Sequence, residues 1–123
     1  MSRRRRSFDA RLRGEFRRRL LESRQALLRT VAATDEEIAE LEPAGPGDSA
    51  DRAAGASVAT LVSRLGGQDK EELDEIAAAL RRLGSGHYGF CTSCREPIAL
   101  ARLRAVPATR YCVQCQTAQE VTS

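Results

Sequence analysis

The chain carries Cys91-Thr92-Ser93-Cys94 and, after seventeen intervening residues, Cys112-Val113-Gln114-Cys115. Two cysteines three positions apart can hold one edge of a metal tetrahedron, and a second such pair can hold the opposite edge. The chain has four cysteines in all. The spacing therefore predicts one structural zinc ion bound by Cys91, Cys94, Cys112 and Cys115. The alternatives are an iron–sulfur cluster and a redox pair, but a redox pair leaves the second motif unexplained.

Four protein ligands leave no open position on the metal, so catalysis at the zinc is not expected and the protein is not predicted to be an enzyme. Four thiolates around Zn²⁺ carry a net negative charge. We expect nearby cations to offset it, and four arginines are close in sequence: Arg95, Arg102, Arg104 and Arg110. His87, the only histidine, lies outside the cysteine pattern.

Upstream of the cysteines, apolar residues recur at three- and four-residue steps, which indicates helices with a coiled-coil seam. Residues 8 to about 41 are predicted to form one helix, and residues from about 48 to 83 a second, kinked at Gly66-Gly67. The loop between them is the stretch 42–49, which contains two prolines and two glycines. The first seam comprises Phe16, Leu20, Leu27, Val31, Ile38 and Leu41, with Arg24 and Thr34 at the intervening positions.

These features predict an all-α fold with a small zinc-binding module. A long antiparallel helical hairpin, about 50 Å from end to end at 1.5 Å per residue, is followed by the four-cysteine zinc finger and a short C-terminal helix. The predicted domains are the coiled-coil hairpin at 1–86, with its loop tip at 42–53, and the zinc module at 87–123. Gly84-Ser85-Gly86 is expected to end the second helix.

Composition narrows the function classes. Aromatic residues make up only 4% of the chain and charged residues 30%, a balance that favours extended helices over a bulky globular core. The net charge is +3, yet residues 1–24 hold ten arginines, so the basic end either attracts an anionic partner or is a solvated arm. No apolar run approaches the roughly 20 residues of a membrane span. We expect a cytoplasmic protein with reduced cysteines and no membrane contact.

An acidic pair, Asp48 and Asp51, marks the predicted loop tip. From the residues alone, helix capping is the favoured role, because Asp48 is a good N-cap and Asp51 is placed as the acid of a capping box. A functional role is the alternative, because an acidic pair at the end of a narrow hairpin can be carried into a deep channel.

Taken together, the motifs resemble the DksA/TraR family of zinc-finger transcription regulators. The resemblance covers about residues 10–120 and includes the helical hairpin. The tip Asp48-x-x-Asp51-x-Ala53 is similar to the family's D-x-x-D-x-A, and Asp51 lies 40 residues before Cys91, as in the family. The module itself reads Tyr88-Gly89-Phe90-Cys91-x-x-Cys94, followed by Pro97-Ile98, Arg102-Leu103, Pro107 and Cys112-x-x-Cys115.

The resemblance implies a partner and a mechanism. Members of this family bind RNA polymerase directly, not DNA, and insert the coiled-coil tip into the secondary channel. Asp48 and Asp51 would then lie near the catalytic centre, with Ala53 allowing close approach, and transcription initiation would be modulated. The tight loop favours a hairpin within one chain, so a monomer is expected.

The sequence also departs from the family pattern. Arg95 follows the first cysteine pair where a glycine is common, which is expected to alter the turn. Four positions associated with a guanosine tetraphosphate site in the family fall on Gln68, Glu75, Val106 and Gln116. None is basic, and a polyanion favours Arg or Lys, so this nucleotide is not expected to bind there.

Three alternative functions stay open. A Gre-like factor would use the tip carboxylates to hold Mg²⁺ and promote transcript cleavage. A nucleic-acid-binding zinc protein would use the arginines of the N-terminus and the zinc module, although no set of base-stacking aromatics is evident. A structural adaptor would dimerise through the coiled coil.

Overall fold

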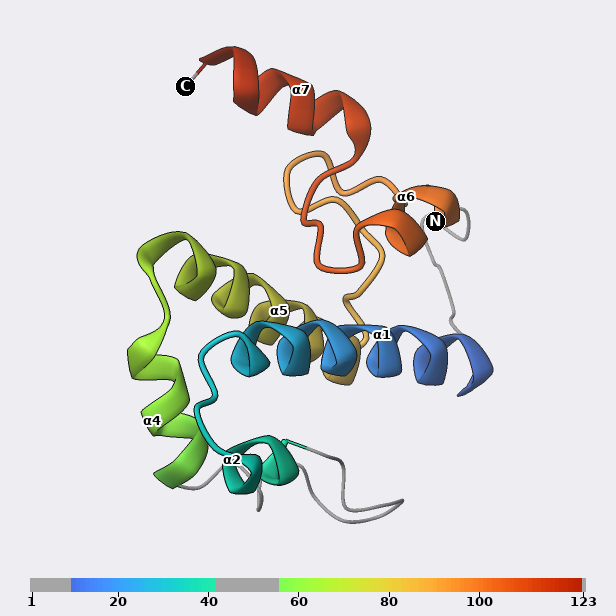
Figure 1. The fold of residues 1–123 in the computed structure, drawn as a ribbon. Coiled ribbons are helices and arrows are strands. Elements are labelled where there is room, and N and C mark those ends of the chain that lie inside the picture. Colours follow the sequence, from blue (N-terminus) through green and yellow to red (C-terminus); the bar gives the residue numbers. More distant parts are fainter. Residues whose placement is uncertain (1–9, 42–55, 123) are drawn as a thin grey trace. The chain divides into compact units, whose positions relative to one another are not determined.

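The computed structural model describes residues 10–41 and 56–122, and most of these residues are helical (Figure 1). Their helices are α1 (Ala10–Arg29), α2 (Asp35–Glu40), α4 (Ala56–Arg64), α5 (Gly67–Ser85), α6 (Leu100–Ala105) and α7 (Val113–Thr122). Extended backbone in these ranges is limited to one isolated antiparallel bridge between Phe90 and Pro97. The predicted all-α class with a short C-terminal helix is confirmed.

The chain divides into two compact units. The cysteine unit combines the N-terminal part of the chain, up to Leu20, with Glu75–Ser123. The hairpin unit is Leu21–Asp74. The predicted domain boundary between residues 86 and 87 stays a prediction.

The single helix predicted over residues 8–41 is wrong, because α1 ends at Arg29 and α2 begins at Asp35. The reason is a helix start signal inside the seam. The Thr34 hydroxyl accepts a hydrogen bond from the Glu37 N–H, and a Glu37 carboxylate oxygen accepts one from the Ala33 N–H. Such reciprocal capping stabilises a new helix N-terminus. Three acidic residues in the first turn of α2 also suit its dipole.

The predicted interruption at Gly66-Gly67 is confirmed, since α4 ends at Arg64 and α5 begins at Gly67. The predicted end of the second helix is also confirmed. Gly86 has φ +85°, and the N–H groups of His87 and Tyr88 both donate to the Arg82 carbonyl. This left-handed glycine and the bond back to Arg82 are typical of a helix C-cap.

Each unit buries its own apolar residues. In the hairpin unit, α2 packs against α4. The core of this unit comprises Leu28, Leu41, Val58, Leu61 and Leu65, with Val31, Ala32, Val62 and Leu73 packed against it. The buried side chains of the cysteine unit include Phe16, Leu20, Ile76, Ala79, Leu83, Tyr88, Ile98 and Leu103.

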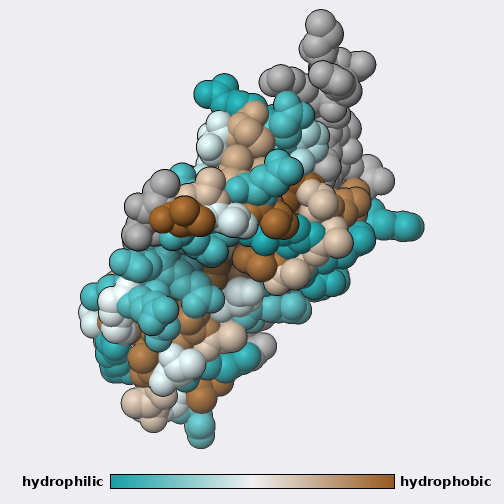
Figure 2. Space-filling model, turned by 90° about the horizontal axis from the view of Figure 1, so that it is seen from above, coloured by the Kyte–Doolittle hydropathy of each residue, from teal (hydrophilic) through white to brown (hydrophobic). Residues whose placement is uncertain are grey.

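Over the face drawn in Figure 2, hydrophobic residues are interspersed among hydrophilic ones. The exposed large apolar side chains of the described part are Ile38, Val106, Val113 and Val121. None of the helices in residues 10–41 and 56–122 is long and apolar enough to cross a bilayer.

Candidate metal centre

The first cysteine pair lies on a tight turn pinned by backbone hydrogen bonds. The Cys91 N–H donates to the Glu96 carbonyl over 2.9 Å, and the Arg95 N–H donates to the Cys91 carbonyl over 2.9 Å. Arg95 has φ +69°, in the left-handed region that favours glycine. The turn therefore keeps the backbone shape that a glycine would adopt, even though an arginine stands there.

The second pair lies at the start of α7. Cys112 immediately precedes this helix and Cys115 lies in its first turn. The two pairs are tied together by the Thr92 N–H, which donates to the Arg110 carbonyl over 2.9 Å. This bond brings the backbone next to each cysteine pair to one place, although the pairs are far apart in sequence.

The four sulfur atoms all lie within 4.8 Å of one another. The Sγ atoms of Cys94 and Cys112 are 3.9 Å apart. A tetrahedron with Zn–S bonds of about 2.3 Å has S–S edges of about 3.8 Å, so the sulfurs stand at the separation that zinc requires. Cys91, Cys94, Cys112 and Cys115 can therefore hold one zinc ion, as predicted from their spacing.

The pKa values of the cysteine thiols are also consistent with a cation bound between them. Burial raises the pKa of Cys91, but backbone N–H donors at Cys94, Cys112 and Ser93 outweigh it and lower the pKa to about 6. The pKa of Cys115 is raised to about 12, chiefly through its side-chain hydrogen bonds with Cys112 and Cys91. Four thiols this close cannot all ionise without a positive charge between them, and Zn²⁺ supplies that charge.

Two of the arginines near the cysteines in sequence, Arg104 and Arg110, form ion pairs with glutamates of the same unit. Arg104 Nε lies 3.0 Å from a Glu15 carboxylate oxygen, and Arg110 Nε lies 2.7 Å from one of Glu75. Both guanidinium groups are thus paired with carboxylates, and the Glu15 carboxylate is also paired with Arg19. They connect the zinc module to α1 and α5 within the cysteine unit.

Arg102 has a structural role beside the second cysteine pair. Its Nε donates to the Tyr111 carbonyl over 2.9 Å, and its Nη2 donates to the Thr109 hydroxyl. Thr109 is buried, and its own hydroxyl donates to the Tyr111 carbonyl. Arg102 therefore fixes the backbone immediately before Cys112.

Tyr88 anchors the module to α1. Its ring centroid lies 5.4 Å from that of Phe16, and its hydroxyl donates to the Pro107 carbonyl over 2.8 Å. Burial raises the pKa of this hydroxyl. His87, by contrast, exchanges a hydrogen bond with the Ser85 hydroxyl, and it is not among the residues of the metal cluster.

The predicted tip residues Asp48, Asp51 and Ala53 lie outside the described residues, so their roles remain predictions. The apolar periodicity of the sequence did not identify Glu37 and Arg64, which form an ion pair in the hairpin unit. The motif Thr34-x-x-Glu37 is a helix start signal, and it could have revealed the first of these.

Comparison with known proteins supports the same reading of the cysteines. Residues 86–121 match the family model described as prokaryotic dksA/traR C4-type zinc finger. An RNA polymerase-binding transcription factor DksA from Caulobacter vibrioides is 33% identical over 105 residues, which cover 85% of this chain and 73% of that protein.

Solved structures resemble this fold. The transcription factor DksA2 of Pseudomonas aeruginosa has a TM-score of 0.58 and 29% identity, over 93% of this chain and 87% of that one. The RNA polymerase binding protein and transcriptional regulator Dks of Chlamydia trachomatis has a TM-score of 0.60, over 94% of this chain and 95% of that one. At 22% sequence identity, this similarity shows only that the two proteins share a fold.

Proposed function

Since the chain belongs to the DksA/TraR family of C4-type zinc-finger proteins, we propose that it binds RNA polymerase and regulates transcription. The observation that carries the proposal is the 33% identity to a polymerase-binding transcription factor over 85% of this chain. The zinc ion has a structural role in this function, because four cysteines occupy every position of its tetrahedron. The relatives are transcription factors, so we do not propose a catalytic activity.

We further propose that residues 42–53 enter the secondary channel of the polymerase. The support is the tip motif Asp48-x-x-Asp51-x-Ala53 and its distance from Cys91 along the chain. The two carboxylates would act near the catalytic centre, and the small Ala53 would allow a close approach. Binding and regulation would then depend on different parts of the protein.

The substitution Asp51→Asn tests this division. It removes one charge and keeps the size of the side chain, so polymerase binding should stay within about twofold while the effect on initiation is lost. A pull-down with core RNA polymerase, followed by crosslinking from position 51, measures the first part, and run-off transcription measures the second. If Asp51→Asn lowers helical content and abolishes binding, the residue is mainly a cap. A crosslink away from the polymerase active site would refute the channel proposal.

We propose that guanosine tetraphosphate does not bind at the site used in the family. Gln68, Glu75, Val106 and Gln116 offer no cation there. The Glu75 carboxylate also faces Arg110, and an acid in this place disfavours a polyanion. Titration calorimetry should show no heat at micromolar nucleotide. Binding that disappears on substitution of residue 75 or 116 would contradict this.

Nucleic-acid binding is a second candidate because the described part of the protein exposes basic residues. A groove of about 500 Å³ in the cysteine unit is lined by Arg13, Arg17, Leu83 and the turn Gly84–Gly86. Guanidinium groups suit phosphate. A duplex-DNA shift without polymerase, falling steeply with salt and weakened by Arg17→Gln, would favour this function over the first.

A further inference from the structure

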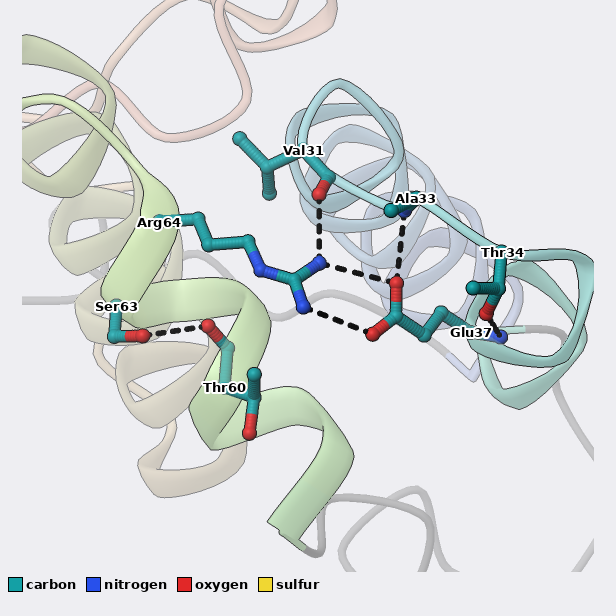
Figure 3. Close-up of polar contacts among 7 residues, drawn as sticks. All are labelled: Val31, Ala33, Thr34, Glu37, Thr60, Ser63 and Arg64. Carbon is teal, nitrogen blue, oxygen red and sulfur yellow. Dashed lines mark hydrogen bonds and ion pairs between the residues drawn. The ribbon is translucent and has the colours of Figure 1, made fainter.

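Two helix breaks in the hairpin unit meet at one side chain. Arg64, the last residue of α4, reaches the break between α1 and α2 (Figure 3). Its Nη1 donates to the Val31 carbonyl and to Glu37 Oε1, each over 3.0 Å, and its Nη2 donates to Glu37 Oε2 over 3.1 Å. A guanidinium bound to both oxygens of one carboxylate is a strong and directional pair.

The contacts of Glu37 exist only while α1 and α2 are separate helices. Glu37 Oε1 accepts from the Ala33 N–H over 2.8 Å, and the Glu37 N–H donates to the Thr34 hydroxyl over 3.1 Å. In an unbroken α-helix the Ala33 N–H would instead donate to the Arg29 carbonyl. The break and the ion pair therefore stabilise each other.

A second contact shows that α2 turns back toward α1. The Gln25 side chain, on α1, donates to the Leu41 carbonyl at the end of α2. In one continuous helix these two residues, sixteen apart, would be separated by a rise of about 24 Å. This hydrogen bond is therefore incompatible with a continuous helix over residues 25–41.

Nothing in the covalent chain requires this break. Residues 30–34 read Thr-Val-Ala-Ala-Thr, and no glycine or proline occurs between Glu15 and Leu41. The three- and four-residue steps of the seam run through the break without a change of phase, at positions 20, 24, 27, 31, 34, 38 and 41. An uninterrupted phase of this kind suits one helix with one apolar face.

We propose that the Glu37–Arg64 ion pair is a latch that holds α1 and α2 folded as two helices, and that its release lets residues 21–41 join into one. The same apolar residues serve both states. Leu41 belongs to the core of the hairpin unit and Val31 packs against that core, and both are also seam positions of the continuous helix. Interfaces that can be buried in two ways are what make such elements bistable.

The consequence for transcription rests on the proposed function. The loop 42–53 follows α2 directly in the chain, so we expect the state of the latch to affect how that loop acts on the polymerase. Glu37 and Arg64 would be positioning residues that never touch the polymerase.

Distance measurement in the free protein tests the latch without reference to polymerase. Spin labels introduced as non-natural amino acids at Glu22 and Glu40 leave the cysteines untouched, and both positions are exposed. A continuous helix separates their backbones by a rise of about 27 Å. Arg64→Ala should add a population near this length and raise helical content in circular dichroism, while zinc content stays unchanged.

Ser63→Ala is the matched control, because it removes the neighbouring bond to the Thr60 carbonyl and leaves the pair intact (Figure 3). It should keep the short distance of the unsubstituted protein. A second variant, Thr34→Leu, removes the cap and completes the seam, and should lengthen the distance further. The latch is refuted if Arg64→Ala and Ser63→Ala give the same distances, or if Arg64→Ala lowers helical content.

Transcription assays with the same variants separate the latch from the proposed function. If Arg64→Ala lengthens the distance and also changes regulation at constant polymerase binding, both proposals gain support. If the distance lengthens and transcription is unchanged, the latch stands and its proposed effect on transcription fails. If the distance is unchanged while transcription changes, the latch is wrong and Arg64 is a polymerase contact.

Discussion

At the scale of single residues, Arg95 is the place where sequence and backbone disagree most. Its φ of +69° lies in the left-handed region, which costs a non-glycine residue roughly 1–2 kcal/mol. Arg95 follows Cys94 directly, and its N–H is bonded to the Cys91 carbonyl. Because Cys91 and Cys94 must both face one metal ion, we expect zinc binding to hold this turn in its strained conformation.

Replacement of Arg95 should show this strain. Arg95→Gly removes it but adds about 0.5–1 kcal/mol of backbone entropy to be lost on folding, so the net gain in unfolding free energy should be at most about 1.5 kcal/mol. Arg95→Val should destabilise the protein, because a β-branched residue is an outlier at positive φ. Thermal melting of the zinc-loaded variants orders them Gly, then Arg, then Val. Equal melting temperatures for Gly and Val would show that the turn is not strained.

The residue scale also shows how well the metal ligands can be predicted and how poorly their surroundings can. The four cysteines are recognisable because their bite is set by spacing within each pair. The roles of Arg104 and Arg110 could not be predicted in this way, because their partners Glu15 and Glu75 lie 89 and 35 residues away. Proximity along the chain predicts an electrostatic partner only when the fold does not offer a nearer one.

At the scale of helices, the two breaks differ in how visible they are. Gly66-Gly67 is explicit, because glycine disfavours a helix wherever it occurs. The break at residues 30–34 contains no such residue, and its cap, Thr34, occupies a seam position. Periodicity describes which face of a helix is apolar, but it does not say whether the backbone is continuous. That depends on Arg64, which reaches the break from another helix.

The ion pair at this break should depend on pH. The hydrogen bond from Arg64 is the main cause that lowers the pKa of the Glu37 carboxyl below its usual 4.5. A carboxyl whose folded pKa is depressed contributes stability above its unfolded pKa, and loses it as pH falls through the folded value. The contribution of the pair to stability should therefore be complete at pH 6, begin to fall as the pH approaches the usual 4.5, and be lost only below the depressed pKa of the folded state.

Comparison with Glu37→Gln isolates this contribution from any acid loss of zinc. Urea unfolding should show the variant less stable than the unsubstituted protein at pH 6, with the difference shrinking toward zero at pH 3. Zinc is affected equally in both proteins, so it cancels in the difference. A difference that is independent of pH would mean that the Glu37 charge contributes nothing and that only its shape matters.

At the scale of the whole molecule, the two units draw on different sources of stability. The hairpin unit has an apolar core built from α1, α4 and the end of α2. The cysteine unit includes long irregular connections around its four cysteines, with helices of only six and ten residues in α6 and α7. Zinc modules of this kind depend on a metal for much of their order, whereas α1 and α5 of the same unit have buried apolar side chains of their own.

Removal of zinc should therefore act on one unit much more than on the other. Binding of a structural zinc ion contributes about 10–16 kcal/mol of apparent free energy in isolated zinc-finger peptides, which is comparable to the whole stability of a small domain. Addition of a chelator should abolish amide hydrogen-exchange protection across residues 87–115. Phe16 should also be uncovered, since Tyr88 packs against it.

Protection across residues 58–65 should persist within about tenfold, because the core around Leu61 contains no residue of the zinc module. Cys91→Ser, read without chelator, should reproduce the pattern and exclude a direct effect of the chelator on the helices. Equal loss of protection in both segments would show instead that the units unfold as one. The zinc would then stabilise the hairpin directly, and the cysteine unit could not be treated as a separate source of order.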